Sequence, residues 1–517
     1  MSASGESGSS GNGNEARGRF LALARDACAM PSGTRIVPVW RELLLDTDTP
    51  VTAYAKIRRG QFGFLLESAP AGGEMWARYT YLGTEPRAAW RLRGGVVDEW
   101  HPDHGWHSSR SPADPLADLD AIVAAEDPLD QPELGAFWTG AVGYFGYDVV
   151  RLIERLPDRP PVDSSIPDAL FIFTRAMVII DNLRARARIV VGVPVRAGAG
   201  EPELEELLAD AEEDIYRLEQ RLRSANPLSS LTLDVQAIPA TGESSIDRPT
   251  FIAGVERIRE HIAAGDCFQA LLSRRIELAA DFDPVTLYRA LRALNPSPYM
   301  YHLVLDGVEI VGSSPELLVR LNDGRVTVRP IAGTRPRGAT TAEDDRLSAE
   351  LLADPKERAE HIMLVDLGRN DVGRVSRYGS VRVTELMQVE KYSHVLHIVS
   401  QIEGTVEGTR SAMDVFRATF PAGTMTGAPK VRAMQIVDEL ETVSRGAYAG
   451  ALGYISGGGS RMDLAITIRT CVIADGIASV QAGAGIVADS VGETEWNETA
   501  SKAGAILVAI GQARAAI

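Results

Sequence analysis

Near its carboxyl end the chain reads Gly483-Ala-Gly-Ile-Val-Ala-Asp-Ser-Val-Gly-Glu-Thr-Glu-Trp-Asn-Glu-Thr-Ala-Ser-Lys502, a glycine-rich segment followed by an acidic one. The first six residues follow a strand-like run and fit the G-x-G-x-x-A pattern of a dinucleotide site. That pattern requires a helix to open at once, with an acidic residue about 20 positions further on. Because Asp489-Ser-Val-Gly492 interrupts it, a nicotinamide site is not expected.

The acidic segment contains two glutamates three residues apart, Glu495 and Glu498, and a second such pair is Glu357 and Glu360. Both segments are predicted to be helical, and residues at i and i+3 share one face of a helix. Each pair therefore places like charges side by side, a repulsion that a hard cation with oxygen ligands relieves. A solvated helix face explains either pair equally well, because glutamate is mostly exposed.

The bulk composition narrows the class of protein. A chain of 517 residues is too long for one ordinary core, so two packed lobes are expected. The formal charge of −17, with no Lys/Arg cluster, disfavours a nucleic-acid role. The three cysteines are far apart and fit neither a disulfide framework nor a zinc site, which favours a cytoplasmic location. No segment approaches the roughly 20 apolar residues of a membrane span.

The expected organisation has four parts: a disordered tail over residues 1–33, a first lobe over 34–225, a linker over 226–247 and a second lobe over 248–517. The tail begins with Ser, Gly, Asn and charged residues, which bury too little to be ordered. Apolar residues at helical spacing predict an amphipathic helix from about Glu201 to Ser224. Gly140-Ala-Val-Gly-Tyr144 resembles Gly450-Ala-Leu-Gly-Tyr454, and chance or similar packing explains one short match as well as duplication does.

Two further segments carry polar groups of possible function. Arg329-Pro-Ile-Ala-Gly-Thr-Arg-Pro-Arg337 combines three arginines with a Gly-Thr turn, which suits a carboxylated ligand or a basic surface loop. His394 and His397 lie in a strand-like run, where a lone histidine is usually a core residue.

Taken together and in order, the segments of the second lobe resemble the chorismate-utilising enzymes. The matching runs are Gly265-Asp-Cys-Phe-Gln269, Ser314-Pro-Glu-Leu-Leu318, Pro330-Ile-Ala-Gly-Thr-Arg-Pro-Arg337, Glu357-Arg-Ala-Glu-His361, Asp366-Leu-Gly-Arg-Asn-Asp371, Gly423-Thr-Met-Thr-Gly-Ala-Pro-Lys430 and Gly483-Ala-Gly485. The first lobe adds Leu65-Leu-Glu-Ser68 and Gly143-Tyr-Phe-Gly-Tyr-Asp148. Each run is weak evidence alone, whereas the ordered set is specific. The resemblance implies an α+β fold of two lobes, with packed antiparallel sheets and outer helices.

Two positions discriminate between members of this family. Isochorismate and salicylate synthases carry a water-activating lysine where this chain has Gln269, so the resemblance implies ammonia as the nucleophile. Aminodeoxychorismate synthases carry a covalent lysine where this chain has Ala332. The expected activity is therefore that of the anthranilate synthase large subunits, a lyase reaction of chorismate with ammonia that yields anthranilate and pyruvate. The aminodeoxychorismate synthase activity is kept as the alternative.

The resemblance also implies roles for individual residues. Mg²⁺ is expected between Glu360 and Glu498, with Glu357 and Glu495 in support. Glu316 is the expected general acid and His397 the residue for pyruvate loss. The other expected catalytic and substrate-binding residues are Gln269, Thr426, Lys502, Gly333, Thr334, Tyr448, Arg469, Gly483, Ala484 and Gly485.

A partner and a regulator are implied as well. None of the cysteines lies in a Gly-x-Cys-x-Gly setting, so ammonia is expected from solution or from a separate glutamine amidotransferase subunit. Feedback inhibition by tryptophan is expected at a pocket between the lobes. The residues expected to form it are Glu67, Ser68, Asn295, Pro298, Tyr299 and Met300.

Overall fold

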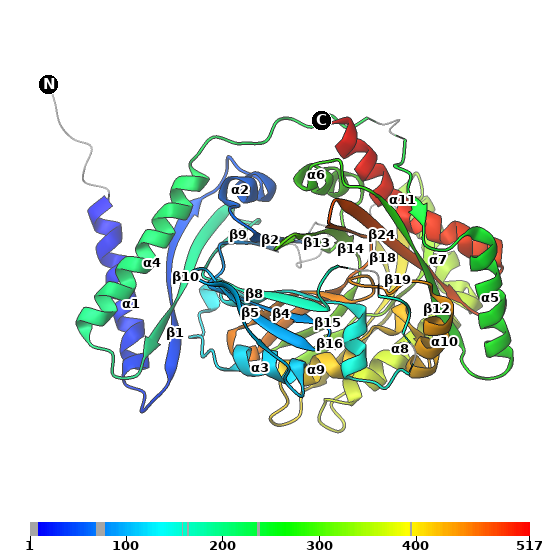
Figure 1. Ribbon diagram of the computed structural model, residues 1–517, viewed down its shortest axis with the longest axis horizontal. Coiled ribbons are helices and arrows are strands. Elements are labelled where there is room, and N and C mark those ends of the chain that lie inside the picture. The colour runs from blue at the N-terminus through cyan, green and yellow to red at the C-terminus, as the bar shows by residue number, and fades with distance from the viewer. Residues whose placement is uncertain are drawn as a thin grey trace.

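The computed structural model describes residues 9–68, 78–157, 159–162, 165–234, 238–392 and 395–516, with side chains from residue 17 onward. Two large antiparallel sheets pack face to face, and helices cover their outer faces (Figure 1). The aromatic cluster between the sheets includes Phe64, Phe137, Tyr144 and Tyr301, all almost fully buried. The predicted α+β fold with packed antiparallel sheets is confirmed.

The first sheet runs through both ends of the chain. In spatial order its strands are β1 (Thr34–Leu44), β10 (Arg186–Arg196), β9 (Ala176–Asp181), β3 (Tyr79–Thr84), β2 (Phe62–Glu67), β13 (Tyr299–Leu305), β14 (Val308–Ser314), β23 (Thr470–Ala474), β24 (Ile477–Ile486), β12 (Gln269–Ala279) and β11 (Glu243–Ser244), with β20 (Gly427–Ala428) paired to β12. The central pair β2/β13 joins the two lobes.

The second sheet is likewise continuous. In spatial order its strands are β17 (Ile331–Pro336), β19 (Val395–Thr405), β16 (Arg325–Val328), β15 (Leu317–Asn322), β22 (Arg461–Ile466), β21 (Ala451–Ser456), β7 (Gly140–Phe145), β8 (Ala169–Phe173), β4 (Ala88–Arg93), β5 (Val96–His101) and β6 (Gly105–Arg110), with β18 (Arg382–Lys391) paired to β19. The lobes expected at residues 34–225 and 248–517 therefore share both sheets.

The two halves of the chain repeat one strand order. Read outward from the centre, the first sheet runs β2-β3-β9-β10-β1 in one half and β13-β14-β23-β24-β12 in the other. The second sheet runs β7-β8-β4-β5-β6 and β21-β22-β15-β16-β19. The similar segments Gly140–Tyr144 and Gly450–Tyr454 belong to the equivalent strands β7 and β21, which pair with each other. This correspondence favours an internal duplication over chance.

The helices follow the same arrangement (Figure 1). The first sheet is covered in one half by α1 (Ser9–Cys28), α2 (Pro50–Ile57) and α4 (Glu201–Leu222), and in the other by α5 (Arg248–Ala263), α6 (Pro284–Leu294), α10 (Lys430–Leu440) and α11 (Gly492–Ala515). The remaining helices, associated with the second sheet, are α3 (Pro115–Ala124), α7 (Thr341–Ala353), α8 (Pro355–Gly373) and α9 (Ala412–Thr419). Short 3-10 turns are η2 (Pro132–Leu134), η3 (Tyr147–Leu152), η4 (Gly423–Met425) and η5 (Gly457–Gly459).

One prediction about the amino terminus is wrong. Helix α1 occupies Ser9–Cys28, inside the segment expected to be a disordered tail. Phe20, Ala24 and Ala27 are buried, and the helix packs on β1. The prediction rested on the Ser/Gly-rich first residues and overlooked the apolar face of the residues that follow. Burial of that face offsets the entropic cost of ordering the helix. The predicted helix near Glu201–Ser224 is confirmed as α4.

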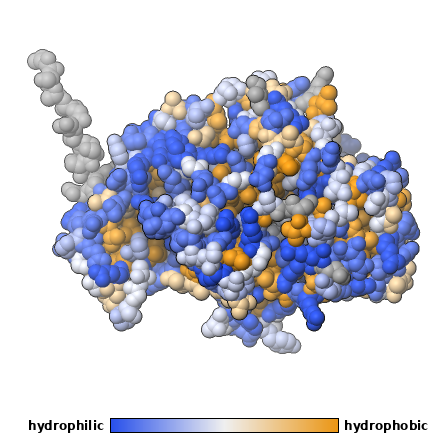
Figure 2. Space-filling view, viewed as in Figure 1, coloured by the Kyte–Doolittle hydropathy of each residue, from blue (hydrophilic) through white to orange (hydrophobic). Residues whose placement is uncertain are grey.

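Hydrophilic residues cover much of the visible face, with apolar residues scattered among them (Figure 2). None of the helices in the described residues is long and apolar enough to cross a membrane.

Candidate functional site

Helices α8 and α11 bring the two predicted carboxylate pairs together. The pKa of Glu360 is raised, first by burial and then by the negative charges of Glu357 and Glu498. Burial raises the pKa of Glu495 too, and Glu498 adds to that effect. These helices therefore form a like-charged cluster whose oxygens are all acceptors.

Two cations balance part of this charge. Lys502 pairs with Glu498 at 2.6 Å, one turn along α11. Arg335 on β17 donates to Glu357 at 3.0 Å. No group of three or more His, Cys, Asp or Glu side chains among the described residues is already arranged around a metal position. The cluster nevertheless suits an ion such as Mg²⁺, which keeps several waters and uses one or two carboxylates.

Glu316 directly precedes β15 and is buried. Burial raises the pKa of its carboxyl to about 7, against the opposing effects of a hydrogen bond from Thr424 and the charge of Lys502. Thr424 Oγ1 donates to Glu316 Oε1 at 2.9 Å. A carboxyl with a pKa near neutrality is suited to proton donation at physiological pH, as expected for a general acid.

His397 projects from β19 beside the turn in β17. Its Nδ1 lies 2.8 Å from the carbonyl oxygen of Gly333 and 3.3 Å from Thr334 Oγ1. Because a carbonyl only accepts, Nδ1 carries the proton and Nε2 is left as a basic nitrogen. Burial lowers the pKa of His397, so the ring carries no charge at neutral pH. His394 lies outside the described residues.

The turn at Gly333 needs glycine. Its φ of +68° lies in the left-handed region, and an added Cβ would stand 3.0 Å from Glu357 Oε2. The turn thus brings the backbone that fixes His397 close to the carboxylate cluster, which no bulkier residue allows without strain.

Lys502 links helix α11 to strand β24, and Arg469, which directly precedes β23, bonds the backbone of α11. Lys502 Nζ donates to the carbonyl oxygen of Gly483 at 2.9 Å, and Arg469 donates to the carbonyl oxygen of Lys502 at 2.9 Å. Tyr448 also lies here, close enough to the backbone of Gly483 for a hydrogen bond. Two cations and the glycine-rich backbone of Gly483, Ala484 and Gly485 therefore adjoin the carboxylate cluster.

Gln269 lies at the start of β12, opposite this backbone. A Cβ added to Gly485 would stand 2.5 Å from Gln269 Nε2, so the close approach depends on glycine. Gln269 is buried, and its Oε1 has no hydrogen-bond partner among the described residues. A buried amide oxygen without a partner is costly unless a ligand or water donates to it.

The structure corrects the expectation for Thr426. Its side chain is fully buried, and its hydroxyl donates to the carbonyl oxygen of Ala422 at 3.1 Å, inside its own loop. Thr424, two residues earlier, is the threonine that contacts Glu316. The sequence offered two similar hydroxyls in one loop, and only the turn η4 determines which one faces the acid.

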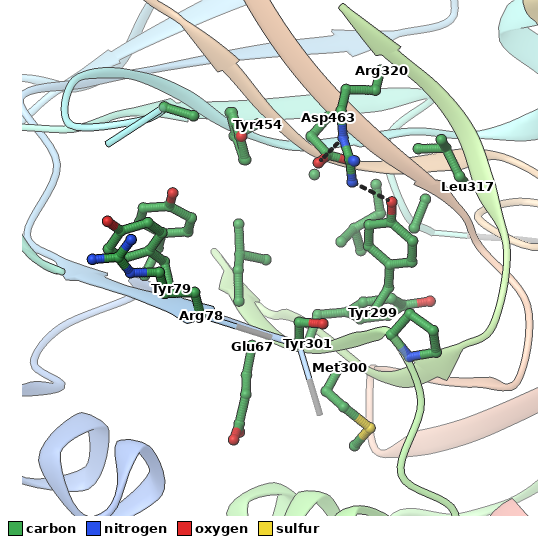
Figure 3. Close-up of a pocket in the computed structure, with 18 of the residues that line it drawn as sticks. Glu67, Arg78, Tyr79, Tyr299, Met300, Tyr301, Leu317, Arg320, Tyr454 and Asp463 are labelled. Carbon is green, nitrogen blue, oxygen red and sulfur yellow. Dashed lines mark hydrogen bonds and ion pairs between the residues drawn. The ribbon is translucent and has the colours of Figure 1, made fainter. Parts of the chain in front are cut away.

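A cavity of about 920 Å³ lies where the two halves meet (Figure 3). Its wall includes Ser68, Pro298 and Tyr299 from the predicted regulatory segments, with the aromatic residues Tyr79, Tyr81, Tyr301 and Tyr454. Arg320 bonds both Asp463, at 2.7 Å, and the hydroxyl of Tyr299, at 3.0 Å. The other oxygen of Asp463, Oδ1, is buried and has no hydrogen-bond partner among the described residues.

Of the residues predicted for this pocket, Asn295 does not line the cavity, and its carbonyl oxygen accepts a hydrogen bond from Ser313. Glu67 and Met300, which pair across β2 and β13, do line it, and their side chains extend to the side of the strands opposite the Tyr299 ring (Figure 3). The carboxylate of Glu67 already accepts hydrogen bonds from Arg292, at 3.0 Å, and from Tyr288, at 2.9 Å.

Comparison with known proteins identifies the class. The model of the chorismate binding enzyme family matches residues 75–508, and the chain belongs to that family. The chain is 46% identical over 501 residues to anthranilate synthase component 1 of Pseudomonas putida, covering 96% of this chain and 98% of the relative. It is 45% identical over 476 residues to anthranilate synthase component 1 of Aquifex aeolicus (strain VF5), covering 92% and 94%.

A solved structure agrees with these relatives. The crystal structure of anthranilate synthase component I from Streptococcus pneumoniae TIGR4 superposes with a TM-score of 0.74 at 36% identity, covering 90% of this chain and 99% of that one.

Proposed function

We propose that the chain is the chorismate-aminating subunit of an anthranilate synthase. It converts chorismate and ammonia to anthranilate, pyruvate and water. The observation that carries this proposal is the buried carboxyl of Glu316, whose pKa lies at about 7 within the influence of Lys502, the lysine that pairs with Glu498. The substrate, chorismate, carries two carboxylates and must lose a hydroxyl. A carboxyl that is still partly protonated near pH 7 can protonate that hydroxyl, and nearby positive side chains with a possible metal site can bind the carboxylates.

The first half-reaction uses Glu316 and Gln269. Ammonia attacks C2 of the ring, the double bonds shift, and Glu316 protonates the departing C4 hydroxyl, which leaves as water. The new C2 ammonium loses one proton, which balances the proton that Glu316 gives up. Gln269 cannot remove a proton from water, and its free Oε1 is suited to accept an N–H bond from ammonia.

Substrate orientation is assigned to the surrounding cations and backbone. Arg469, Tyr448 and the amides of Gly483–Gly485 hold the enolpyruvyl carboxylate, while Gly333 and Thr334 line the ring. Lys502 balances the charge of Glu498 and lies close enough to Glu316 to influence its pKa. Positioning of this kind supplies a large part of an enzyme's rate enhancement.

The second half-reaction is assigned to His397. Its Nε2 removes the ring proton at C2 as the C3–O bond breaks, and the ring becomes aromatic. The enolpyruvate released takes up a proton at its methylene carbon and becomes pyruvate. The hydrogen bond between His397 Nδ1 and the Gly333 carbonyl supports this role, because it leaves Nε2 as the base.

Mg²⁺ is proposed as the cofactor, with Glu360 and Glu498 as ligands and Glu357 and Glu495 supporting it through water. The fit rests on acceptor-only oxygens of like charge, and the pKa of Glu360 is raised first by burial and then by Glu357 and Glu498. When bound, the ion supplies Lewis-acid polarisation and neutralises the ring carboxylate of the substrate.

Ammonia is proposed to come from a separate glutamine amidotransferase subunit. Cys267 and Cys471 are buried, and burial raises the pKa of both thiols, which makes them poor nucleophiles. Glutamine alone is therefore expected to give no product with the isolated chain, and product formation from the pure chain and glutamine would contradict the partner assignment.

Tryptophan is proposed as a feedback inhibitor bound in the 920 Å³ cavity. Pro298, Tyr299 and Tyr454 offer apolar and aromatic walls to an indole, and Asp463 Oδ1 offers an acceptor to its ammonium group. An aromatic cage with one free carboxylate oxygen suits an aromatic amino acid. Glu67 is not assigned to the ammonium group, because its carboxylate already accepts hydrogen bonds from Arg292 and Tyr288.

One assay tests the main proposal. The chain is incubated with chorismate, MgCl₂ and an ammonium salt, and anthranilate is followed by its fluorescence. Product is expected from the parent and not from Glu316→Gln, which has no acidic proton of suitable pKa. A fully active Glu316→Gln variant would remove the general-acid assignment. A non-aromatic product that carries the amino group at C4 and keeps the enolpyruvyl ether at C3 would favour the aminodeoxychorismate alternative.

A further inference from the structure

The loop between α9 and α10, residues 420–429, is largely buried and is anchored at several points. Lys430, at its end, bonds Thr419, at its start, with its Nζ 3.3 Å from the carbonyl oxygen. The same Nζ pairs with Asp371 of α8 at 2.7 Å, and both side chains of that pair are buried. One lysine therefore closes the loop on itself and fastens it to the helix that carries Glu360.

The other side of the loop is fastened to the strand that carries Gln269. Gly427 and Ala428 form β20 and pair with Ala270 and Gln269 of β12. The amide of Leu271 donates to the carbonyl oxygen of Thr426 at 2.9 Å. Arg445, which is buried, donates to the carbonyl oxygen of Met425 at 2.7 Å. The residue held between these anchors is Thr424.

Thr424 is the only described residue that donates a hydrogen bond to the Glu316 carboxyl. The bond runs from its Oγ1 to Oε1, at 2.9 Å. A carboxylic acid has one proton, and its carbonyl-type oxygen is a better hydrogen-bond acceptor than the oxygen that carries the proton. A donor at Oε1 therefore leaves the acidic proton on Oε2.

We propose that Thr424 is a positioning residue for the general acid: its hydroxyl holds Glu316 Oε1 as an acceptor, so that Oε2 carries the proton delivered to the leaving hydroxyl. The inference rests on the proposed role of Glu316 and adds what fixes that carboxyl. The Asp371–Lys430 pair keeps Thr424 in place, at a distance from the reacting atoms.

The charged groups around Glu316 define its pH behaviour. Lys502 acts on it from α11, and its positive charge opposes the rise of the pKa that burial causes. Arg329 and Asp371 share with it a cavity of about 40 Å³, which also reaches Thr424. Arg329 pairs with Glu390, and Asp371 pairs with Lys430, so both are already balanced. Thr424 is the neutral donor in this set and favours the ionised carboxyl by hydrogen bonding.

Replacement of Thr424 by valine keeps the shape and removes the donor. The carboxylate loses stabilisation, so the pKa of Glu316 rises and the loss of activity at high pH moves upward by about one pH unit. The carboxyl also loses its fixed orientation, and kcat at the plateau is expected to fall by about ten- to a hundredfold with KM within about twofold. Chorismate consumption and anthranilate formation should fall together, because Glu316 acts in the first half-reaction.

The experiment is a pH profile of kcat at constant free ammonia for the parent and for Thr424→Val, Thr424→Ser and Thr426→Val, with melting temperatures measured alongside. Thr424→Ser keeps the hydroxyl and should restore the parent midpoint. Thr426→Val removes a hydroxyl that bonds only its own loop, so its midpoint should stay at the parent value. Thr424→Ala replaces the valine variant if that protein fails to fold.

The outcomes distinguish failure of the Thr424 positioning role from failure of the Glu316 general-acid role. If Glu316→Gln is inactive while Thr424→Val has the parent kcat and midpoint, the positioning role is overturned and the general acid stands. If Glu316→Gln is active, the proposed general acid itself fails. A midpoint shift in Thr426→Val as large as in Thr424→Val would assign the effect to loop packing and overturn the inference.

Discussion

The two halves of the molecule share one topology but differ in what interrupts it. In the first half, β5 and β6 are joined by residues 102–104. In the second half, the equivalent strands β16 and β19 are separated by residues 329–394, which form β17, α7, α8 and β18. Glu357, Glu360 and Thr334 lie in this inserted segment, and His397 follows it directly. The duplicated framework is a scaffold, and much of the proposed chemistry was added to one copy.

Equivalent helices also treat their carboxylates differently. In α4, Glu219 is bonded by Arg41 and Arg223, and although burial opposes the effect, these bonds lower its pKa overall. In α11, which follows the equivalent strand, Glu495 lies beside Glu498, and its pKa is raised by burial and by that neighbour. A buried carboxylate matched by arginine stabilises the fold, whereas one faced by like charge is poised for a ligand.

The largest difference in effect between the two halves is expected from Glu498→Gln, a change in the second half. Loss of the charge of this proposed metal ligand should lower kcat/KM by about a thousandfold, since metal stabilisation of a reaction is worth several kcal/mol. Calorimetric titration with MgCl₂ should show weakened binding, and thermal unfolding should show an intact fold. Parent activity at limiting Mg²⁺ would remove Glu498 from the metal site.

His397→Met tests whether His397, which directly follows the inserted segment, acts only in the second half-reaction. The variant should still consume chorismate and ammonia, while anthranilate formation falls by about a hundredfold. That factor is the lower end of the rate contribution that a general acid or base usually makes. Chromatography should then detect a non-aromatic aminated intermediate. Equal loss of chorismate consumption and product formation would mean that His397 serves the first step too.

The cavity where the halves meet is tested by Ser68→Arg. The longer side chain should fill part of the cavity and weaken tryptophan inhibition by about 5- to 150-fold, the range usual for coupled sites. Asp463→Asn is a useful companion, because it keeps the shape and removes the charge proposed to bind the ammonium group. Inhibition measured with ammonia as donor decides the matter, and equal inhibition of parent and both variants would move the site elsewhere.

The smallest effect is expected from Glu219→Ala in the first half. Activity should stay at the parent level, while the free energy of unfolding falls by about 1 kcal/mol, because both arginines are partly exposed. The pKa of Glu219 is lowered by folding, so its contribution is full above the unfolded value of about 4.3 and disappears as pH falls through the folded value. Denaturant unfolding at neutral and acidic pH measures the difference.

Local patterns in the sequence predicted much of this structure. The i,i+3 spacing placed Glu357 with Glu360, and Glu495 with Glu498, on helices as observed. The helix α4 followed from its apolar periodicity. The continuity of both sheets across the halves was not predicted, because the pairings β2/β13 and β7/β21 join residues far apart in the chain.

The details of the site depended on geometry that spacing does not encode. Thr424 and Thr426 look alike in the sequence, and a 3-10 turn decides which one reaches Glu316. Tyr299 and Met300 both line the large cavity, and strand alternation sends their side chains to opposite sides of β13. The capture of Glu67 by Arg292 needed the position of α6 relative to β2, which local sequence does not fix.

Leu317 and Arg329 line both the large cavity between the halves and the small cavity beside Glu316. A wall shared by two sites offers a route by which binding at one could change affinity at the other, and any such coupling is reciprocal. If tryptophan weakens chorismate binding through this wall, chorismate must weaken tryptophan binding by the same factor. The concentration of tryptophan that gives half inhibition would then rise with the concentration of chorismate, and the inhibition would respond to both metabolites together.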